Sequence, residues 1–513
     1  MKKELALFEL IHSLSTSERR YLTLQMVANR KDSNLLKLFE VISDMKEYDE
    51  ANIIENFKGE TFLKQIHVTR NHLYEAILKH MRSYDMEKTI DYRIKGMIQD
   101  VKFLFEKRLF SHCESALRRS MKFANRYDRY TSILELLEWK AKLMTADFYA
   151  GKEESDIDAI SEEYYEVLEK LQNIREYSDL QAKIFNNFYK IGIERKNEHY
   201  KTNDQIINQF ALRDVNRALT FKSLCCYLNI HSIYCKINND WEGSYAYRKQ
   251  LLDVILEKED KTEEHITMLF GALNNLLPVC IKLEKFDEAE NYIMQMKQIP
   301  ADYSNLKVSE DLMMKIFTQS AVAELSLYVN TGEKEKGMKL IEEIEKNTIG
   351  MESRFRKFPL LHLYYNMAYF LFSVEEYSES IKWLNKLLND NSLSSIEDLH
   401  SSSRILNMIL QYELEKDDFM EYLTRSTYRY LYKLEGLYKF ENILLNFLKK
   451  HTKFESKTAR EKAFGKLKNQ LEQTRYEPGE RNALSTLDLM TWVESKIQHI
   501  PFCEIKKASV LKR

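Results

Sequence analysis

The spacing of apolar residues is the feature that most constrains how this 513-residue chain can fold. Apolar residues recur at intervals of three and four along almost the whole sequence, as at Leu134, Leu137 and Ala141. That period places them on one face of an α-helix. No stretch sustains the two-residue alternation of a half-buried β-strand. The sequence therefore predicts an all-α protein.

The scarcity of glycine and proline supports this prediction. The chain has 12 Gly and 5 Pro, whereas average usage would give roughly 36 and 26. Folds rich in β-turns and glycine-lined nucleotide sites need more of both residues. A chain of this length must form about three domains or grow as a stack of repeated units. The composition favours the stack.

Four segments, residues 227–255, 272–300, 321–345 and 363–388, share one pattern. Each has an apolar helix, a short polar turn and a second helix that opens with a small residue. The small residues are 45, 48 and 43 positions apart. They are Ser244, Ala289, Gly337 and Ser380. This internal repetition predicts stacked helix pairs, in which each pair covers the apolar face of its neighbour.

The segment 272–300 resembles a tetratricopeptide repeat. The family pattern is an apolar first helix, an aromatic residue after the turn, an alanine three residues later and a closing proline. It appears here as Leu273, Leu276, Phe286, Ala289 and Pro300. Trp241 and Tyr377 take the aromatic place in the first and fourth segments, whereas the third has Lys334. The resemblance implies an α-α superhelix of antiparallel helix pairs, a TPR-like solenoid.

The repeats depart from the family in length, because the usual unit has 34 residues. Longer helices or extra turns would account for the difference. Weaker copies of the pattern occur at residues 102–124 and 409–431. We therefore expect an N-terminal helical region at 1–90, helical repeats over 91–448 and a basic C-terminal helical segment at 449–513. Pro278 would free the carbonyl of Asn274 and bend the first helix of its pair, or else mark a helix boundary.

The resemblance also implies a function. Repeats of this family bind a peptide or protein in a groove lined by the first helix of each pair. The matching positions here are Asn229, Lys236, Asn274, Lys282, Gln319, Asn330, His362, Tyr365 and Tyr369. For each of them, ordinary solvent exposure is the alternative. The Lys, Asn and Arg set with which chaperone adaptors of the family hold a carboxy-terminal peptide is not reproduced. A scaffold or adaptor whose partner is unidentified is the leading expectation.

The segment 61–84 suggests a different function. It resembles the second and third helices of a helix-turn-helix, with Arg70, Asn71 and His72 placed to face DNA bases. The chain would then be a transcriptional regulator with the repeats as a sensor or oligomerisation region. However, His67 occupies the position where the motif usually has a glycine in the turn. The apolar residues of this segment also fit one face of a continuous helix. A break in the helix near His67, followed by an exposed basic helix, would favour the regulator. A continuous buried helix would favour the scaffold.

A second basic feature lies near the C-terminus, from Lys449 to Arg475. It holds nine Lys or Arg and three Glu, a net charge of +6. Such a run is either the solvated face of a helix or a docking surface for an anionic partner. The whole chain has a net charge of -2, which argues against general attraction to nucleic acid.

No motif points to catalysis. The sequence has no GxxxxGK[ST], GxGxxG or HExxH, and His67, His72 and His80 are not spaced to hold a metal. The acidic runs are typical of solvated helix faces. The six cysteines show neither a paired framework nor a CxxC, which indicates reduced thiols in the cytoplasm. The apolar run 360–372 is shorter than the roughly 20 residues of a membrane span. We expect no enzyme, cofactor, metal or membrane segment.

Overall fold

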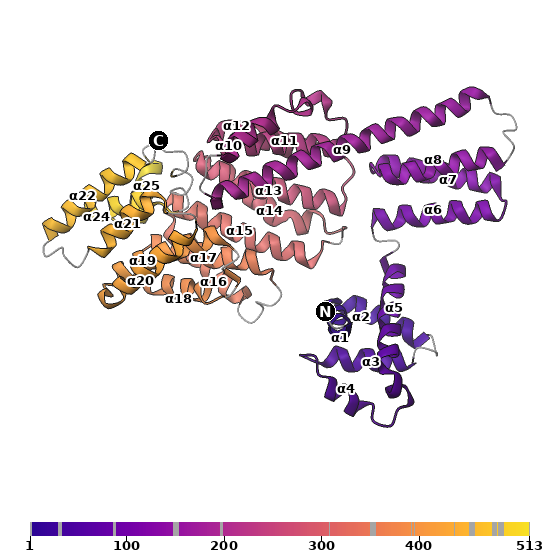
Figure 1. Cartoon of the computed structure of the whole chain (residues 1–513), viewed down its shortest axis with the longest axis horizontal. Coiled ribbons are helices and arrows are strands. Elements are labelled where there is room, and N and C mark those ends of the chain that lie inside the picture. Colours follow the sequence, from indigo (N-terminus) through magenta and orange to yellow (C-terminus); the bar gives the residue numbers. More distant parts are fainter. Residues whose placement is uncertain are drawn as a thin grey trace. The chain divides into compact units, whose positions relative to one another are not determined.

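Helices joined by short connections make up the protein in the computed structural model (Figure 1). No strand occurs among the described residues, so the predicted all-α class is confirmed. Contacts divide the chain into two units, residues 1–169 and 170–513, and the boundary lies at neither of the positions predicted from the sequence. The structure describes residues 3–28, 33–85, 89–146, 153–194, 198–306, 308–348, 355–390, 392–393, 396–434, 437–450, 457–474, 480 and 487–511.

The first unit contains a five-helix bundle and a further set of three helices. The bundle surrounds the buried side chains of Leu7, Ile11, Leu38, Ile53 and Leu73. Its elements are α1 (Lys3–Ser13), α2 (Thr16–Ala28), α3 (Ser33–Asp44), α4 (Glu50–Asn56), the 3-10 helix η2 (Thr61–Gln65) and α5 (Ile66–Asp85). The helices α6 (Ile90–Glu106), α7 (Phe110–Arg126) and α8 (Tyr130–Ala146) pack on one another. The helix α9 (Glu154–Glu194) continues into the second unit.

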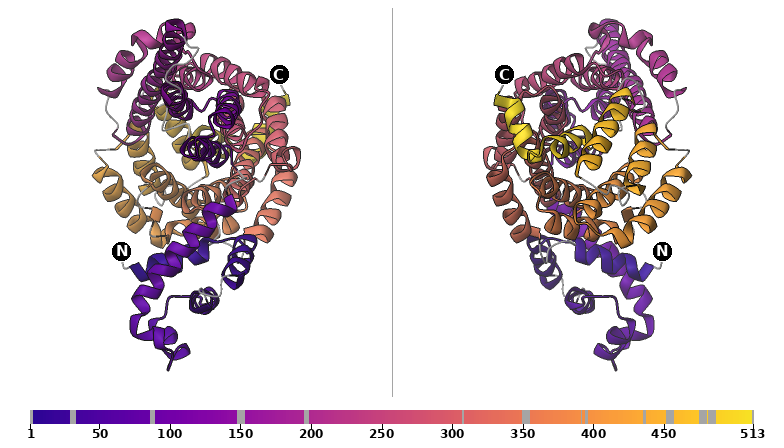
Figure 2. Two further views of the ribbon diagram at one scale, coloured as in Figure 1. Left: turned by 90° about the vertical axis from the view of Figure 1, so that its right-hand side faces the viewer. Right: turned by 90° about the vertical axis from the view of Figure 1, so that its left-hand side faces the viewer.

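The second unit is a stack of antiparallel helix pairs, each packed against its neighbours in sequence (Figures 1 and 2). It opens with α10 (Glu198–Ile207), η3 (Phe210–Leu212) and η4 (Val215–Arg217). The pairs are α11 (Phe221–Ile237) with α12 (Trp241–Glu257), α13 (Glu263–Lys282) with α14 (Phe286–Asp302), α15 (Glu310–Thr331) with α16 (Lys334–Thr348), α17 (Lys357–Ser373) with α18 (Tyr377–Leu388), and α19 (Glu397–Glu413) with α20 (Asp417–Lys433). The last helices are α21 (Lys439–Lys449), α22 (Lys457–Thr474), α24 (Leu489–Gln498) and α25 (Phe502–Leu511).

The four segments predicted to form helix pairs do so, and the two weaker copies of the pattern correspond to α6–α7 and α19–α20. Each pair turns through one residue in the left-handed conformation. These residues are Arg108, Asn239, Glu284, Gly332, Glu375 and Glu415. The next N–H then bonds to a carbonyl five residues earlier, as from Lys285 to Cys280 (2.9 Å) and from Glu376 to Leu371 (2.9 Å). This is the Schellman end of an α-helix, repeated along the chain.

Ser244 and Ser380 lie where the two helices of a pair approach closely, and Gly337 lies where one pair meets the next. The Ser244 hydroxyl is 3.1 Å from that of Ser232, on the facing helix. The Ser380 hydroxyl donates to the Ala368 carbonyl (2.6 Å). A Cβ added to Gly337 would overlap the buried ring of Phe370. Larger side chains at these positions would force the helices apart.

Among the described residues, two prolines lie beyond the first turn of a helix. The helix α13 runs through Pro278 to Lys282, so the predicted boundary there is absent. Pro300, expected to close its repeat, lies inside α14, which ends at Asp302. A helix can retain a proline because only one backbone N–H donor is lost and the neighbouring packing holds the rest.

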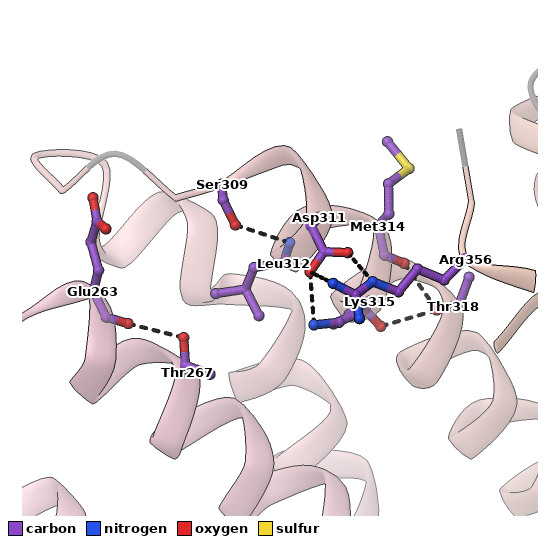
Figure 3. A network of polar contacts seen from close by, with 9 residues as sticks. All are labelled: Glu263, Thr267, Ser309, Asp311, Leu312, Met314, Lys315, Thr318 and Arg356. Atoms are coloured by element: carbon purple, nitrogen blue, oxygen red, sulfur yellow. Dashed lines mark hydrogen bonds and ion pairs between the residues drawn. The ribbon is translucent and has the colours of Figure 1, made fainter. Parts of the chain in front are cut away.

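A carboxylate connects two successive first helices at their N-terminal ends (Figure 3). The Ser309 hydroxyl caps α15 by accepting from the Leu312 N–H (3.2 Å). Two residues on, Asp311 pairs with Lys315 (2.7 Å) and accepts from Nη2 of Arg356 (3.0 Å), the residue before α17. Burial raises the pKa of Asp311, but Lys315 and Arg356 outweigh it and the pKa is lowered. The ionised carboxylate therefore helps to hold α15 and α17 side by side.

The C-terminal helices belong to the same core as the preceding pairs. Phe464, Trp492 and Phe502 are buried in one cluster with Phe372 and Leu410. A Cβ on Gly332 would collide with the backbone of α25, so α25 lies directly against the end of α15. From the sequence, residues 449–513 were expected to form a separate basic segment. The described helices of this segment instead complete the core of the last repeats.

Candidate binding site on the helical repeats

The residues predicted to read DNA lie on opposite faces of α5. This helix begins at Ile66 directly after η2, so the chain has no turn at His67 and no single α-helix from 61 to 84. Arg70 shares a face with the buried Leu73 and Ile77 and is itself 6% exposed. Its Nη2 donates to Oε2 of Glu50 (2.8 Å). Arg70 therefore faces the bundle core, contrary to the expected orientation.

Asn71 and His72, the other two predicted DNA-reading residues, are exposed. They lie on the solvent side of α5 because residues one and two positions from Arg70 rotate away from the buried face. The structure therefore separates the three residues that the helix-turn-helix interpretation groups together.

Most of the predicted groove residues reach solvent. Lys282 and His362 are exposed. The partly exposed members are Asn229, Lys236, Asn274, Gln319 and Asn330. The amide of Asn330 donates to the Ser326 carbonyl one turn earlier (2.8 Å). These positions are distributed over α11, α13, α15 and α17, the first helices of four successive pairs.

Lys236 lies near a second cation, Arg248. The ammonium of Lys236 is 4.9 Å from the ring centre of Phe188, and burial together with the charge of Arg248 lowers its pKa to about 8. Arg248 is 6% exposed, and burial lowers its pKa to about 10. Its Nε and Nη1 atoms are enclosed without a hydrogen-bond partner. These two cations therefore destabilise each other in their charged forms.

Of the last two groove residues, Tyr369 contacts the C-terminal part of the chain and Tyr365 packs against Tyr369. Tyr365 is buried and its ring stacks on that of Tyr369, with centres 6.3 Å apart. The Tyr369 hydroxyl accepts a hydrogen bond from the Asp488 N–H (3.0 Å). Burial, with the charge of Asp488, raises the pKa of Tyr369. A partner could bind both tyrosines only if this C-terminal contact opened.

The same C-terminal segment is anchored to α19. The Trp492 indole N–H donates to Oε1 of Glu413 (2.6 Å), and the Lys496 ammonium pairs with Oε2 of that carboxylate (2.6 Å). The Phe502 and Phe372 rings meet edge to face, with centres 6.1 Å apart. This segment therefore packs against α17 and α19, at one end of the predicted groove.

The strongest candidate site is one that the sequence analysis missed. A cavity of about 440 Å³ lies between α19 and α20, and we name it the α19–α20 pocket. Four of its lining residues are cationic, and none carries a carboxylate. The lining residues are Arg404, Tyr422, Arg425, Ser426, Arg429, Tyr430 and Lys433.

The pocket follows from the pattern of α20. Arg425, Arg429 and Lys433 recur every four residues, so they lie on one face at steps of about 6 Å along the axis. Thr427 and Leu431 are buried on another face of the helix. A row of cations at this spacing in a tyrosine-rich helix is the signal that could have identified the site from the sequence. The contribution of Arg404 depends on the packing of α19 against α20.

Arg404 is held in place by uncharged groups. Its Nε donates to Nε2 of His400 (2.9 Å), and its guanidinium carbon is 4.6 Å from the ring centre of Tyr430. Its Nη1 is 3.4 Å from the Ser426 hydroxyl. Burial and the charge of Arg404 lower the pKa of His400 to about 4, so the imidazole is neutral at pH 7. Because Nε2 accepts a bond, the proton lies on Nδ1.

Other cavities are less suited to an anion. One of about 400 Å³ between α6 and α7 is lined by Arg93, Arg119, Lys122 and Arg126, but also by Asp100. Another, of about 530 Å³, lies beside α14, α15 and α25. Its acidic lining residues are Glu284, Asp287, Glu288, Glu290 and Glu333. Among these three cavities, the α19–α20 pocket alone combines cations with no acidic side chain.

Within the part of the chain that the structure describes, no three His, Cys, Asp or Glu residues are grouped so as to hold a metal ion. None of the described helices combines the length and the apolar character needed to cross a bilayer. Burial, with the neighbouring Cys226, raises the pKa of the Cys225 thiol to about 12, and burial also raises the pKa of Cys226, which disfavours the thiolate at both positions. Comparison of the sequence with protein-family models and with curated proteins found no match.

Proposed function

We propose that this protein is a non-catalytic scaffold or adaptor that binds an acidic protein or peptide segment on its helical repeats. The observation that carries the proposal is the α19–α20 pocket, in which Arg404, Arg429 and Lys433 converge without a carboxylate. Unneutralised cations in a concave site attract anionic ligands and accelerate their association. A stack of helix pairs supplies an extended surface for the rest of the partner.

The predicted groove supports the same function over part of its length. Lys236, Asn274, Gln319 and His362 present polar side chains at the surface of successive first helices. Tyr369 is bonded to the C-terminal segment. We therefore assign partner binding to the exposed groove residues and to the α19–α20 pocket, and leave the two tyrosines in a structural role.

The alternative proposal, a DNA-binding regulator, receives less support. Its central residue, Arg70, is occupied by Glu50. A guanidinium that is buried and paired in this way cannot donate to a base edge or a phosphate without disrupting the bundle. Asn71 and His72 remain exposed, and they supply the test of this alternative.

The experiment is in-cell crosslinking followed by purification of the tagged full-length protein and mass spectrometry. Wild type is compared with the pocket variant Arg404→Gln/Arg429→Gln and the matched control Lys462→Gln/Lys466→Gln. The control removes two exposed charges from α22. We expect a small set of proteins to be captured by wild type and control and lost from the pocket variant. Equal capture by all three proteins would exclude the pocket as the binding site.

The same preparations test the regulator. Duplex DNA binding is measured at physiological salt for wild type and Asn71→Ala/His72→Ala. We expect only weak binding that depends steeply on salt and is unchanged in the variant. Sequence-specific binding that this variant abolishes would establish the regulator instead.

A further inference from the structure

We infer that the α19–α20 pocket recognises a phosphorylated side chain on the partner. This inference rests on the proposed function and specifies its ligand. The pocket's charge is the first argument. Arg425 pairs with Glu421 (2.8 Å), but Arg404, Arg429 and Lys433 have no carboxylate partner among the described residues.

A phosphate monoester matches that charge better than a carboxylate does. An Asp or Glu side chain brings one negative charge and two acceptor oxygens. A phosphorylated side chain brings about 1.5 to 2 charges and three strong acceptors at pH 7. A single carboxylate would leave most of the positive charge of the three cations unbalanced. A phosphate dianion balances more of that charge and offers an acceptor oxygen to each cation.

The second argument is the fixed geometry of Arg404. His400 accepts from its Nε, Ser426 lies beside Nη1, and the Tyr430 ring covers one face of the guanidinium. None of these partners is negatively charged at pH 7. The fork is therefore oriented before any ligand arrives, which reduces the entropy lost on binding. Burial lowers the pKa of Arg404, and an incoming anion would offset that desolvation.

Tyrosine side chains at the rim of the pocket can contact the rest of the ligand. Tyr422 is 70% exposed beside the cations, and Tyr430 forms part of the lining. A cavity of about 440 Å³ is larger than a phosphate group alone. The aromatic rings and the Ser426 hydroxyl can therefore contact the side chain that carries the phosphate and the peptide around it.

The surroundings favour a compact phosphate over an extended nucleic-acid strand. Glu421 flanks Arg425 on α20 and is exposed. At the start of α19, Glu397 and Asp398 both raise the pKa of Tyr430, after the larger effect of its burial, so their charges lie near the pocket. The Glu397 carboxylate would repel a backbone phosphate placed beside it, and Glu421 already occupies Arg425. A single phosphorylated side chain avoids them.

The test uses the full-length protein and fluorescent peptides of degenerate sequence that differ only at one central residue. The central residue is phosphoserine, phosphothreonine, phosphotyrosine, Glu or Ser. Fluorescence anisotropy gives the affinity for wild type, Arg404→Lys, Arg429→Gln and the control Lys466→Gln. We expect one phosphopeptide pool to bind at least tenfold more tightly than the Glu and Ser pools. We expect Arg404→Lys and Arg429→Gln each to lose most of that preference, and Lys466→Gln to retain it.

Arg404→Lys keeps the charge but removes the planar guanidinium, and Arg429→Gln alters an exposed side chain. A loss of binding in either variant therefore does not require a change of fold. Glu and phosphopeptide pools that bind equally, and that both weaken in Arg429→Gln, would overturn the phosphate inference and leave the proposed function standing. No binding of any acidic pool would overturn both. Tighter binding of a 20-nucleotide oligo-dT than of every phosphopeptide pool, lost in Arg429→Gln, would assign the pocket to nucleic acid.

Discussion

Arg70 and Arg248 are equally buried, each with 6% of its surface exposed, but their electrostatic surroundings are opposite. Arg70 in the first unit donates to the Glu50 carboxylate (2.8 Å). In the second unit, Nε and Nη1 of Arg248 have no hydrogen-bond partner. The comparison shows that burial alone does not reveal what an arginine does. The presence of a carboxylate partner distinguishes a buried arginine that stabilises the fold from one that destabilises it.

The cations of the α19–α20 pocket form a third class. Arg404 is half-buried and Arg429 is exposed, and neither has a carboxylate partner among the described residues. Water can still solvate these groups, so they cost less than Arg248. They also remain accessible to a ligand, as Arg70 is not. The four predictions that follow test this division.

The largest effect is expected when the partner of Arg70 is removed. Glu50→Gln would remove the carboxylate to which the buried Arg70 guanidinium donates, and we expect a loss of about 2 to 3 kcal/mol, less than for a fully buried pair because Glu50 is partly exposed. Thermal unfolding monitored by circular dichroism measures this loss. Glu47→Gln, an exposed carboxylate nearby, serves as the control.

The same pair predicts a pH dependence. Burial raises the pKa of Glu50, but hydrogen bonds from Tyr48 and Arg70 outweigh it, so the pKa is below its ordinary value of 4.5. The stability it contributes is present above that value and is lost as the pH falls through the lower, folded-state pKa. Glu50→Gln should lack this loss. An identical acid response in wild type and variant would show that Arg70 is stabilised by its other contacts.

The second prediction reverses the sign. Arg248→Met should stabilise the second unit by about 1 to 2 kcal/mol, because a buried, unpaired charge is replaced by an apolar side chain of similar length. Urea unfolding of wild type and variant measures the difference. A clear loss of stability in Arg248→Met would mean that an anion neutralises Arg248 in solution, and the contrast with Arg70 would disappear.

These charges also mark what could be predicted from the sequence. The three- and four-residue period identified the helix pairs, and it also placed Leu73 and Ile77 on one helical face. Arg70 shares that face, three positions before Leu73. Its burial could therefore have been read from the same stripe that suggested a continuous helix. The helix-turn-helix interpretation placed Arg70 toward DNA because it assigned residues by motif position and not by helical face.

Other features depend on contacts between distant residues. Asp488 and Tyr369 are 119 positions apart, so no local pattern predicts that the C-terminal segment covers the groove there. The α19–α20 pocket needs Arg404 and Arg429 from two helices. The positions of the turns were predicted but their left-handed residues were not, because Glu284 and Glu375 adopt a conformation that usually signals glycine. Packing within the repeats stabilises these turns, and that packing is not visible in a single segment.

The third prediction is smaller and concerns Lys236. Burial and the charge of Arg248 lower its pKa to about 8, from the ordinary value of 10.5. The unfolded chain therefore binds more protons between these pH values, and stability should rise as the pH increases through this range. We expect a gain of about 1 kcal/mol, discounted for partial exposure of the side chain.

Lys236→Met should abolish this rise, and its stability should exceed that of wild type most at pH 7. Arg248→Met should reduce the rise without abolishing it, because the burial of Lys236 remains. Urea unfolding from pH 7 to pH 11 provides the measurement. A flat wild-type profile over this range would show that Lys236 is neutralised by another group, and that the two cations are not coupled.

The smallest effect on stability is expected for Arg429→Gln. The side chain is exposed on α20 and forms no ion pair among the described residues, so the free energy of unfolding should change by less than about 0.5 kcal/mol. Binding should respond instead. Capture of an acidic partner should weaken in the variant, and in wild type it should weaken as salt shortens the range of electrostatic attraction from about 10 Å at 0.1 M to about 3 Å at 1 M.

This last substitution tests the comparison directly. Arg429→Gln removes a positive charge from α20, whereas Glu50→Gln removes the carboxylate beside the buried charge of Arg70. If Arg429→Gln lowered the melting temperature as much as Glu50→Gln, the cations of α20 would serve the fold, as Arg70 does, and the pocket would lose its proposed role. If stability and salt-dependent capture were both unchanged, Arg429 would be an ordinary solvated side chain. Unchanged stability with weakened capture would identify Arg429 as a binding residue and not a structural one. In that case its charge would contribute to the affinity for the ligand and not to the free energy of unfolding.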